Sequence, residues 1–559
     1  MSGWIILATA LVYVSFLFAI ASIGDKRGQQ VSQTPRPLTY ALSLAIYCTS
    51  WTFFGSVGLA AERGIEFLGI YIGPILVFLF GHRLLRRIVR LSKSERITSI
   101  ADFLAARYGK SFAVASLATL IATFGTIPYI ALQLKAIAGS VELLAAHFSA
   151  PGSPVAAGFG NVALISSALL ALFAILFGTR HTDATEHQDG LVLAVAVESV
   201  IKLGAFLAIG ATVTFFMADA PGNLLDGMRE NAQIRAALEN QTSIQSWIVI
   251  TVLSGIAIIM LPRQFYIAVV ENRSEKELDK ASWLFPSYLV LINLFVLPIA
   301  FAGVMMVGDR TSADLYVLAI PLLNGNEVMA LVALIGGLSA ATAMVIVASV
   351  ALSIMISNDM VIPLFLRRNV LPADGMKDDW SNRILHIRRA SICLILAASF
   401  IYFQEMSGNV RLASIGLLSF AAIAQFAPAF LGGLFWRAAN ARGAIMGMAA
   451  GFAMWAFTLL LPTIMPPDQA SLQDGLFGLG WLNPAMIFGT GNNAFNNGVI
   501  WSLAVNTFFF VFGSLSRMST PRERIQAAIF VPRETGQLPS LRRFRTTITV
   551  NELKDTISR

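Results

Sequence analysis

The amino-acid sequence predicts an all-α polytopic membrane protein with about 13 transmembrane helices, an outside N-terminus and a cytoplasmic C-terminus. Three observations support this class. Of the 559 residues, 56% are hydrophobic and only 13% are charged, whereas a soluble domain carries about 25% charged residues. The mean hydropathy of +0.70 is correspondingly high. The apolar residues also gather in long runs, and most of the basic residues lie between these runs.

Each apolar run has about the 20 residues that a helix needs to cross the hydrocarbon core. No basic residue precedes the first run, so we expect a retained helix rather than a cleaved signal peptide. The runs cover residues 3–23, 37–59, 65–81, 112–137, 160–179, 190–216, 246–270, 283–307, 327–356, 390–405, 412–435, 443–462 and 497–516.

Basic residues are distributed asymmetrically between the runs. With an outside N-terminus, the inside segments hold 32 of the 40 Lys and Arg residues, and the outside segments hold five. This bias follows the positive-inside rule and sets the predicted orientation. It also accounts for the net charge of +8 without a nucleic-acid partner. The inside segments are 24–36, 82–111, 180–189, 271–282, 357–389, 436–442 and 517–559.

Cysteine usage argues against two kinds of site. Only Cys48 and Cys393 occur, both inside apolar runs, so neither a disulfide framework nor a thiolate metal centre is expected. The sequence also contains no phosphate-binding loop and no metal-ligand cluster. We therefore expect no metal, no cofactor and no enzymatic activity in this chain.

Two of the runs contain residues that favour a broken helix. The second run includes a polar, glycine-bearing stretch at 48–58 (CTSWTFFGSVG), and the seventh includes Ser254-Gly255 and then Pro262-Arg263. The two runs lie five apart and cross in opposite directions, as the broken helices of an inverted repeat (runs 2–6 and 7–11) would. Alternatively, these small residues only allow helices to pack closely.

Several short motifs resemble the sodium/solute symporter family across about residues 37–460. Residues 97–109 (ITSIADFLAARYG) resemble a cytoplasmic loop of that family, and residues 357–359 (SND) follow the ninth run. Residues 427–428 (AP), 434–437 (LFWR) and 442–444 (RGA) look like the junction between its eleventh and twelfth helices. The resemblance implies a LeuT-type fold with a five-plus-five inverted repeat, one helix before it and two after.

Within that family the chain looks most like the transporter half of CbrA-type sensor histidine kinases. The similar segments are 177–181 (FGTRH), 185–187 (TEH), 261–265 (LPRQF) and 339–342 (SAAT). The resemblance implies a symporter-like domain linked to amino-acid uptake, notably of histidine. It also implies a cytoplasmic kinase or response-regulator pathway as partner.

The kinase itself is not expected in this chain. None of the five histidines lies in the cytoplasmic tail, and no ATP-binding domain follows. We expect a transmembrane domain over 1–516 and a basic cytoplasmic tail over 517–559. By resemblance the tail is the start of a linker domain to a kinase. The alternative is an ordinary basic tail lying against anionic lipid.

The resemblance also implies a sodium site built from carbonyls of the second helix and hydroxyls of the ninth. A hard cation prefers oxygen ligands, yet the two expected hydroxyl positions here are Ala343 and Met344. Sodium coupling is therefore in doubt, and a proton is the next candidate coupling ion. The equivalent positions of this degraded site are Ala45, Cys48, Ala340, Ala343 and Met344.

Ionisable residues inside the runs are candidates for proton or gate functions. Glu198 and Lys202 are four apart, so they share one helix face as either a proton relay or a structural ion pair. Arg263 either pairs with an acid such as Asp183 or Glu186 in an inner gate or snorkels to the interface. Lys135, expected near the outer end of its run, is a further snorkelling candidate.

The candidate substrate site combines flat aromatic faces with hydroxyl and amide groups. Trp51 and Tyr129 can pack against an organic solute, and a freed helix N-terminus can hold a carboxylate. For each aromatic residue, ordinary core or lipid-facing packing is the alternative. The candidate residues are Thr49, Ser50, Trp51, Thr52, Tyr129, Gln133, Ser254 and Gly255.

Together these features predict a secondary transporter of a small polar solute in a bacterial-type inner membrane. The solute is expected to be an amino acid such as histidine, and the domain is expected to act as the input module of a two-component system. The alternative is a transport-dead sensor that binds solute and relays a conformational change to a cytoplasmic signalling domain.

Overall fold

The computed structural model describes residues 3–30, 34–148, 161–178, 188–217, 227, 229–239, 243–367, 377–405, 411–464, 475, 479–484, 486–487 and 493–531. All regular secondary structure in these residues is helical. Among these residues, ten helices are long and apolar enough to cross a membrane, or eleven if the bent pair Ala232–Glu239 and Ile244–Met260 counts as one span. The chain is a multi-pass membrane protein, as its composition predicts.

The N-terminal half contains a peripheral helix followed by the first broken helix. Its elements are α1 (Gly3–Gln30), α2 (Pro37–Ser43), η1 (Leu44–Tyr47), η2 (Trp51–Gly55), α3 (Ser56–Arg63), η3 (Gly64–Leu68), α4 (Gly69–Phe80), α5 (His82–Ser94), α6 (Ile100–Arg107), α7 (Phe112–Phe148), α9 (Val162–Gly178), α10 (Asp189–Thr212) and η4 (Val213–Met217).

The C-terminal half begins with a short surface helix and the second broken helix. Its elements are α12 (Ala232–Glu239), α13 (Ile244–Met260), α14 (Pro262–Phe265), η5 (Tyr266–Val270), α15 (Glu275–Asn293), α16 (Val296–Met306), η6 (Gly308–Arg310), η7 (Ala313–Leu315), α17 (Tyr316–Leu323), α18 (Glu327–Met355), η8 (Ile356–Val361), α19 (Ile362–Arg367), α20 (Lys377–Glu405), α21 (Leu412–Ile423), η9 (Ala424–Phe426), α22 (Ala427–Phe435), α23 (Ala441–Trp455), η10 (Ala456–Leu460), α24 (Leu461–Ile464), η12 (Gly480–Leu482), α26 (Ala494–Leu515) and α27 (Pro521–Phe530).

Each of the predicted apolar runs coincides with helical residues, but two boundaries were clearly wrong. The run at 390–405 is the end of α20, which begins at Lys377. The run at 112–137 belongs to α7, which continues to Phe148. Pro128 lies inside this helix without ending it, because neighbouring helices can accommodate such a break in a bundle. Lys135 is therefore in the interior of a long helix and only half-exposed, so it does not lie at the helix end where we expected it to snorkel.

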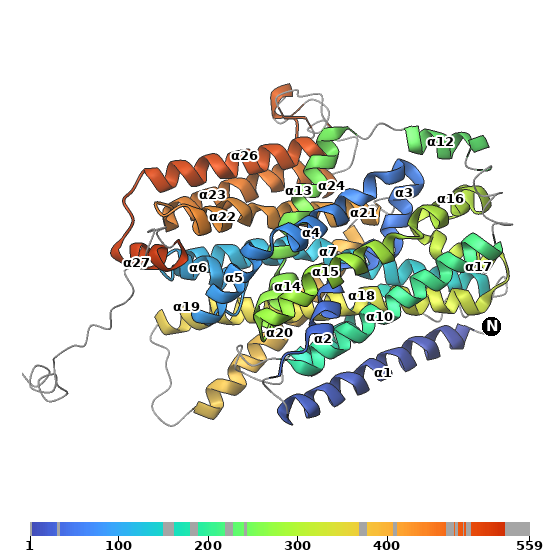
Figure 1. The fold of residues 1–559 in the computed structure, drawn as a ribbon, viewed down its shortest axis with the longest axis horizontal. Coiled ribbons are helices and arrows are strands. Elements are labelled where there is room, and N and C mark those ends of the chain that lie inside the picture. Colours follow the sequence, from blue (N-terminus) through green and yellow to red (C-terminus); the bar gives the residue numbers. More distant parts are fainter. Residues whose placement is uncertain are drawn as a thin grey trace, which may run out of the picture.

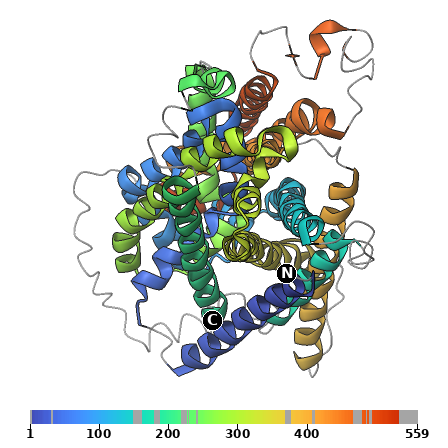
Figure 2. The ribbon, with the colours of Figure 1, turned by 90° about the vertical axis from the view of Figure 1, so that its right-hand side faces the viewer.

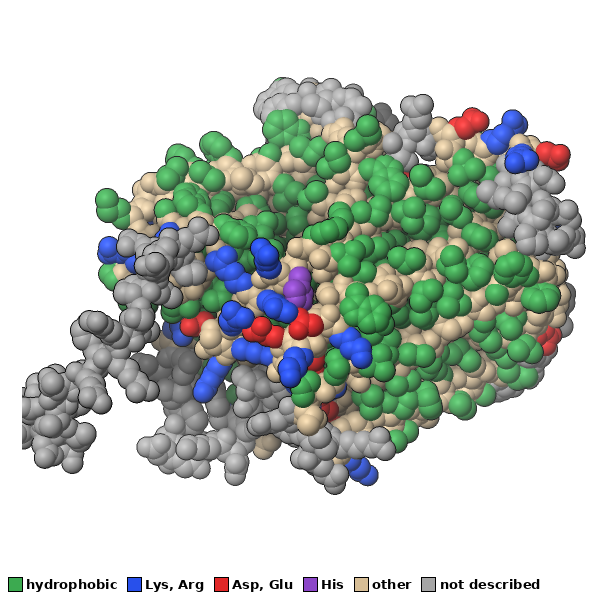
Figure 3. All heavy atoms as spheres, viewed as in Figure 1, with side chains coloured by type: hydrophobic (Ala, Val, Ile, Leu, Met, Phe, Trp, Pro, Cys, Tyr) green, Lys and Arg blue, Asp and Glu red, His purple; other side chains and the backbone are tan. Residues whose placement is uncertain are grey.

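The long helices run roughly along the long axis of the molecule (Figure 1). α5, α6 and α27, which belong to predicted inside segments, gather at one end, whereas α12 and α17 lie toward the other end (Figure 1). Figure 3 shows most basic and acidic side chains of one face gathered in one part of it, with a smaller group at the upper right and apolar side chains over much of the rest. This separation of charged from apolar surface suits a bundle whose sides face lipid.

α18 lies inside the bundle, with other helices packed around it (Figure 2). It is the most buried of the ten candidate spans. Small residues allow this close packing: a Cβ atom on Gly336 would lie 2.5 Å from the ring of Phe53, and one on Gly337 would lie 2.4 Å from Phe54. Such small-residue contacts are the usual means by which membrane helices approach one another. They fix α18 against η2, beside the first helix break.

Two of the family-like motifs contact each other. Arg107 at the end of α6 donates hydrogen bonds to the carbonyls of Gly433 and Trp436, and the Tyr108 hydroxyl donates to the carbonyl of Ala429. The loop motif at 97–109 is thus fixed to the end of α22, where the LFWR motif lies. Burial raises the pKa of Tyr108, which keeps its hydroxyl a hydrogen-bond donor.

The described part of the tail packs against the same region. Thr520 and Glu523 form a capping box at the start of α27, which stabilises a helix N-terminus. Phe530 is fully buried, and its ring meets that of Phe103 edge-on at 5.3 Å. Residues 517–531 are therefore docked on the transmembrane domain. The remainder of the predicted tail, 532–559, lies outside the described residues.

Candidate substrate and ion site

Both predicted broken helices are broken in the structure. In the first, Cys48 has an extended backbone (φ −79°, ψ 97°) between η1 and η2. In the second, Leu261 has a non-helical backbone (φ −58°, ψ 131°) between α13 and α14. The second break has a local cause, because a residue before proline is driven out of the helical region. α13 runs unbroken through Ser254 and Gly255, so the helix breaks only at Leu261.

The two breaks are neighbours in space. α14, which begins just after the second break, packs against η1, which ends at the first break, and against α18. The segments next to Cys48 and Pro262, which are 214 positions apart in the sequence, therefore pack together inside the bundle. Unwound backbone at this depth is tolerated where protein surrounds it, and it supplies polar groups that an intact helix lacks.

Four of the candidate substrate residues form one buried polar cluster. The Thr49 and Tyr129 hydroxyls are 3.0 Å apart, and the Ser50 backbone N–H donates to the Gln133 side-chain oxygen at 3.1 Å. Each of these four side chains is at most 2% exposed. The Ser50 hydroxyl has no hydrogen-bond partner among the described residues, so the cluster retains at least one free polar group.

The Trp51 backbone N–H donates to the Thr49 hydroxyl at 3.2 Å, but among the described residues no hydrogen bond joins a side chain of the other four candidates to this cluster. The Trp51 indole N–H donates to the Ala413 carbonyl, which makes the ring a packing contact with α21. Thr52 is buried. Ser254 donates to the carbonyls of Gly69 and Thr251. Gly255 lies where α13 packs on α4, since a Cβ atom on Gly73 would lie 2.5 Å from its backbone nitrogen. For Ser254 and Gly255, the alternative of close helix packing describes the structure.

Lys202 donates to the carbonyls expected to hold sodium. Its Nζ atom lies 2.8 Å from the Ala45 oxygen and 2.7 Å from the Cys48 oxygen. These are the two backbone ligands that the family resemblance implies. The three equivalent positions on α18 (Ala340, Ala343 and Met344) are buried and carry no side-chain oxygen. A protein ammonium group thus holds the carbonyls at the first break.

Glu198 has separate partners. Its carboxylate accepts hydrogen bonds from Thr342 at 2.5 Å and from Tyr13 at 3.4 Å, and Ser339 bonds to its backbone carbonyl. Within the described chain, no ion pair joins it to Lys202 within 4.0 Å. The structural ion pair that we considered is therefore absent, because Lys202 extends to η1 and the break after it, while Glu198 faces α1 and α18.

Arg263 differs from Lys202 in having no hydrogen-bond partner. Its side chain is 1% exposed, and none of its three guanidinium nitrogens has a partner among the described residues. The guanidinium lies 4.4 Å from the ring centroid of Tyr129, whose ring stacks with that of Phe420 at 5.8 Å. Arg263 therefore does not snorkel. Asp183 and Glu186, the acids proposed for an inner gate, lie outside the described residues.

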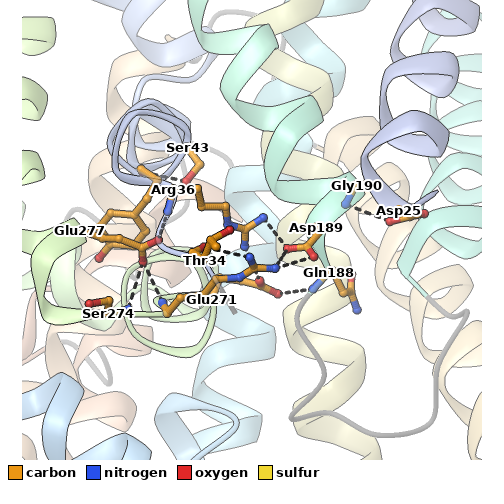
Figure 4. Close-up of polar contacts among 12 residues, drawn as sticks. Asp25, Thr34, Arg36, Ser43, Gln188, Asp189, Gly190, Glu271, Ser274 and Glu277 are labelled. Carbon is orange, nitrogen blue, oxygen red and sulfur yellow. Dashed lines mark hydrogen bonds and ion pairs between the residues drawn. The ribbon is translucent and has the colours of Figure 1, made fainter. Parts of the chain in front are cut away.

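An ion-pair network that the sequence analysis missed connects four helical elements (Figure 4). Asp189 at the start of α10 pairs with Arg36 at 2.6 Å and Arg273 at 2.5 Å. The Arg36 backbone N–H donates to Glu277 at 2.7 Å, and Arg36 also pairs with Glu271 at 3.4 Å. The network joins α2, α10, η5 and α15 on the predicted cytoplasmic side. Its charges belong to three separate inside segments, and the sequence shows only that each segment is charged.

Comparison with known proteins identifies the fold. No family model matches the chain. The curated relative found is an uncharacterized symporter, YodF of Bacillus subtilis, which is 22% identical over 466 residues, 80% of this chain and 84% of the relative. A solved sodium-coupled sialic acid symporter matches with a TM-score of 0.63 and 14% identity over 92% of this chain and 98% of its own. The chain has a LeuT-type fold.

The LeuT-type fold that the family resemblance implies is therefore confirmed. The two matching proteins are both described as symporters, in agreement with the expectation that the chain is not an enzyme.

Proposed function

We propose that the protein is a secondary transporter that moves a small polar solute by alternating access. The observation that carries this proposal is the meeting of two broken helices around a buried polar cluster that contains Thr49, Ser50, Tyr129 and Gln133. Transporters place their solute at such breaks, because the unwound backbone frees hydrogen-bonding groups near the midplane. The symporter relative and the symporter fold support the same class of function.

We further propose that transport does not require sodium at the first break. Lys202 already supplies a positive charge to the carbonyls of Ala45 and Cys48, at hydrogen-bond distance. A sodium ion bound to the same two carbonyls would be repelled by the ammonium group and would lack the hydroxyl ligands that α18 does not provide. A proton gradient is the coupling that remains in this proposal, with Glu198 and Lys202 as the candidate proton-binding groups.

The ion-pair network is the proposed cytoplasmic gate. Release of solute toward the cytoplasm requires the start of α2 to separate from α10 and α15, and the Arg36–Asp189 and Arg36–Glu277 contacts oppose that movement. Partly buried ion pairs of this kind rearrange as units in two-state transitions. Solute binding at the breaks and opening of the network would then alternate.

The proposed solute is an amino acid, with histidine the first to test, and the proposed location is a bacterial inner membrane. Uptake of radiolabelled L-histidine into proteoliposomes, with sodium and proton gradients imposed separately, tests the proposal. We expect uptake with a proton gradient in sodium-free buffer. Uptake that depends only on sodium would contradict the assignment of Lys202. Saturable binding without uptake under either gradient would favour a sensor.

The sensor is a second candidate because the tail is docked on the domain. Arg87 donates to the carbonyl of Phe530 and Arg437 to that of Val531, so α27 is held beside α6. Ser99, at the start of α6, bonds to Asp359 in η8 at 2.8 Å, directly after the helix whose Thr342 binds Glu198. A conformational change at the site can therefore reach the tail through these contacts. In this proposal the tail would pass the change to a linker and a kinase domain.

A fluorophore attached through Met518→Cys, a position that is 94% exposed, tests the sensor candidate in a background in which Cys393 is replaced by serine. A change in its fluorescence on addition of solute would support a relay to α27. No change at a solute concentration that saturates binding would contradict it.

A further inference from the structure

The unpartnered guanidinium of Arg263 is the most unusual polar group in the described part of the bundle. Two other arginines are equally buried at 1% exposure, and both have partners. Arg107 donates to two backbone carbonyls, and Arg388 donates to Ser357 and Asn358. Arg263 contacts Tyr129, with its guanidinium 4.4 Å from the ring centroid, and none of its three nitrogens has a hydrogen bond to a described residue.

A buried cation without hydrogen bonds carries the full cost of its desolvation. Native proteins leave few buried polar groups unsatisfied, and such groups call for a specific reason. A cation–π contact with Tyr129 offsets part of this cost but provides no acceptor for the N–H groups. The guanidinium therefore has free binding capacity at the point where the two helix breaks meet.

Other free groups indicate the kind of ligand that fits. The Ser50 hydroxyl and both side-chain polar atoms of Gln264 also lack partners among the described residues. Tyr47, Tyr129 and Phe420 provide aromatic faces in the same region, with the ring of Phe420 5.8 to 6.1 Å from the other two. The charge at the breaks is also unbalanced: Glu198 is the acid nearest to Lys202 on their shared helix, and Arg263 adds a second cation.

We propose that Arg263 binds the carboxylate of the transported solute. A carboxylate presents two oxygens that match the two parallel N–H donors of a guanidinium, and such bidentate pairs are stronger than neutral hydrogen bonds. A single negative charge also balances the extra cation, and the aromatic faces suit an organic body attached to it. This inference rests on the proposed transport function and names the substrate class, a monocarboxylate such as an α-amino acid.

The experiment compares matched acids and amides. Thermal unfolding of the purified full chain in detergent is measured with L-histidine, L-phenylalanine, L-proline and L-lactate, and with the amide of each. We expect at least one acid to raise the melting temperature and its amide to have no effect. For that acid, Arg263→Gln should weaken apparent affinity by at least tenfold, about 1.4 kcal/mol, and Arg263→Lys should weaken it less.

Arg388→Gln is the matched control, because it removes a buried arginine that already has partners. It should lower the melting temperature without changing the preference for acids over amides. Equal protection by acids and amides, unchanged affinity in Arg263→Gln, or no protection by any acid would each overturn the proposal. Acid-selective binding without uptake would contradict the transport function alone, whereas uptake of amides would contradict this inference alone.

Discussion

The two buried cations at the helix breaks, Lys202 and Arg263, have opposite hydrogen-bond environments. Lys202 reaches two backbone carbonyls at 2.7 and 2.8 Å, whereas Arg263 has no hydrogen-bond partner in the described structure. Both are at most 1% exposed. The difference indicates that burial of a charge alone does not define its role. A satisfied cation stabilises the protein in its present state, while an unsatisfied one is available to a ligand.

Replacement of Lys202 should have the largest effect. In Lys202→Met the carbonyls of Ala45 and Cys48 lose a charged donor, so we expect stability to fall by about 3 kcal/mol. Lys202→Arg, which keeps the charge, should lose less. Thermal unfolding in detergent, with and without sodium chloride, measures both variants. A Lys202→Met protein as stable as the wild type would contradict a stabilising role for Lys202. Partial recovery of stability in sodium chloride would show that a sodium ion can replace the ammonium group at these carbonyls.

Replacement of Arg263 should change stability in the opposite direction. Without solute, Arg263→Gln removes an unsatisfied buried charge, so we expect stability to be unchanged or to rise by about 1–2 kcal/mol. The same thermal unfolding experiment, run without any carboxylate in the buffer, provides the measurement. Destabilisation as large as that of Lys202→Met would show that Arg263 is a structural residue.

The ion-pair network allows a third test, through the native thiol at the first break. Cys48 is fully buried, so in a background with Cys393→Ser its labelling rate reports opening of the site. Asp189→Asn removes the shared partner of Arg36 and Arg273, and we expect labelling to accelerate about tenfold, equivalent to about 1.4 kcal/mol.

Asp279→Asn is the control for this test. Asp279 pairs with Arg86 and His82, but its side chain is 48% exposed, and exposed ion pairs contribute little. We expect no change in the labelling of Cys48. Equal acceleration by both variants would mean that the network does not gate the site.

Ser254 should give the smallest effect. Ser254→Ala removes a hydrogen bond to the Gly69 carbonyl, for which we expect a loss of about 1 kcal/mol of stability. Because Ser254 lies between α13 and α4 and not in the polar cluster, affinity for solute should not change. Isothermal titration of the purified variant with the carboxylate that binds the wild type most tightly checks this. A loss of affinity would place Ser254 in the site.

The sequence predicted more of the fold than of the site. Apolar runs and basic connectors are local properties, so the helices over 3–23 through 497–516 fall where they were expected. Thr49, Ser50, Tyr129 and Gln133 were also predicted and lie together. Ser254 and Gly255 do not join them, because glycine and serine occur both at helix breaks and at packed helix surfaces. Their spacing alone does not distinguish the two uses.

The sequence by itself determined that the chain crosses the membrane many times, and it indicated a break in the helix that contains Pro262. Hydropathy and the steric effect of proline act on neighbouring residues and need no tertiary context. Only the tertiary structure decided which buried charges are satisfied. Lys202 finds carbonyls 154 and 157 positions away, and Arg263 finds none. Hydrogen-bond satisfaction depends on groups that are distant in the chain, and so does the distinction between a cation that holds the fold and one that can hold a ligand.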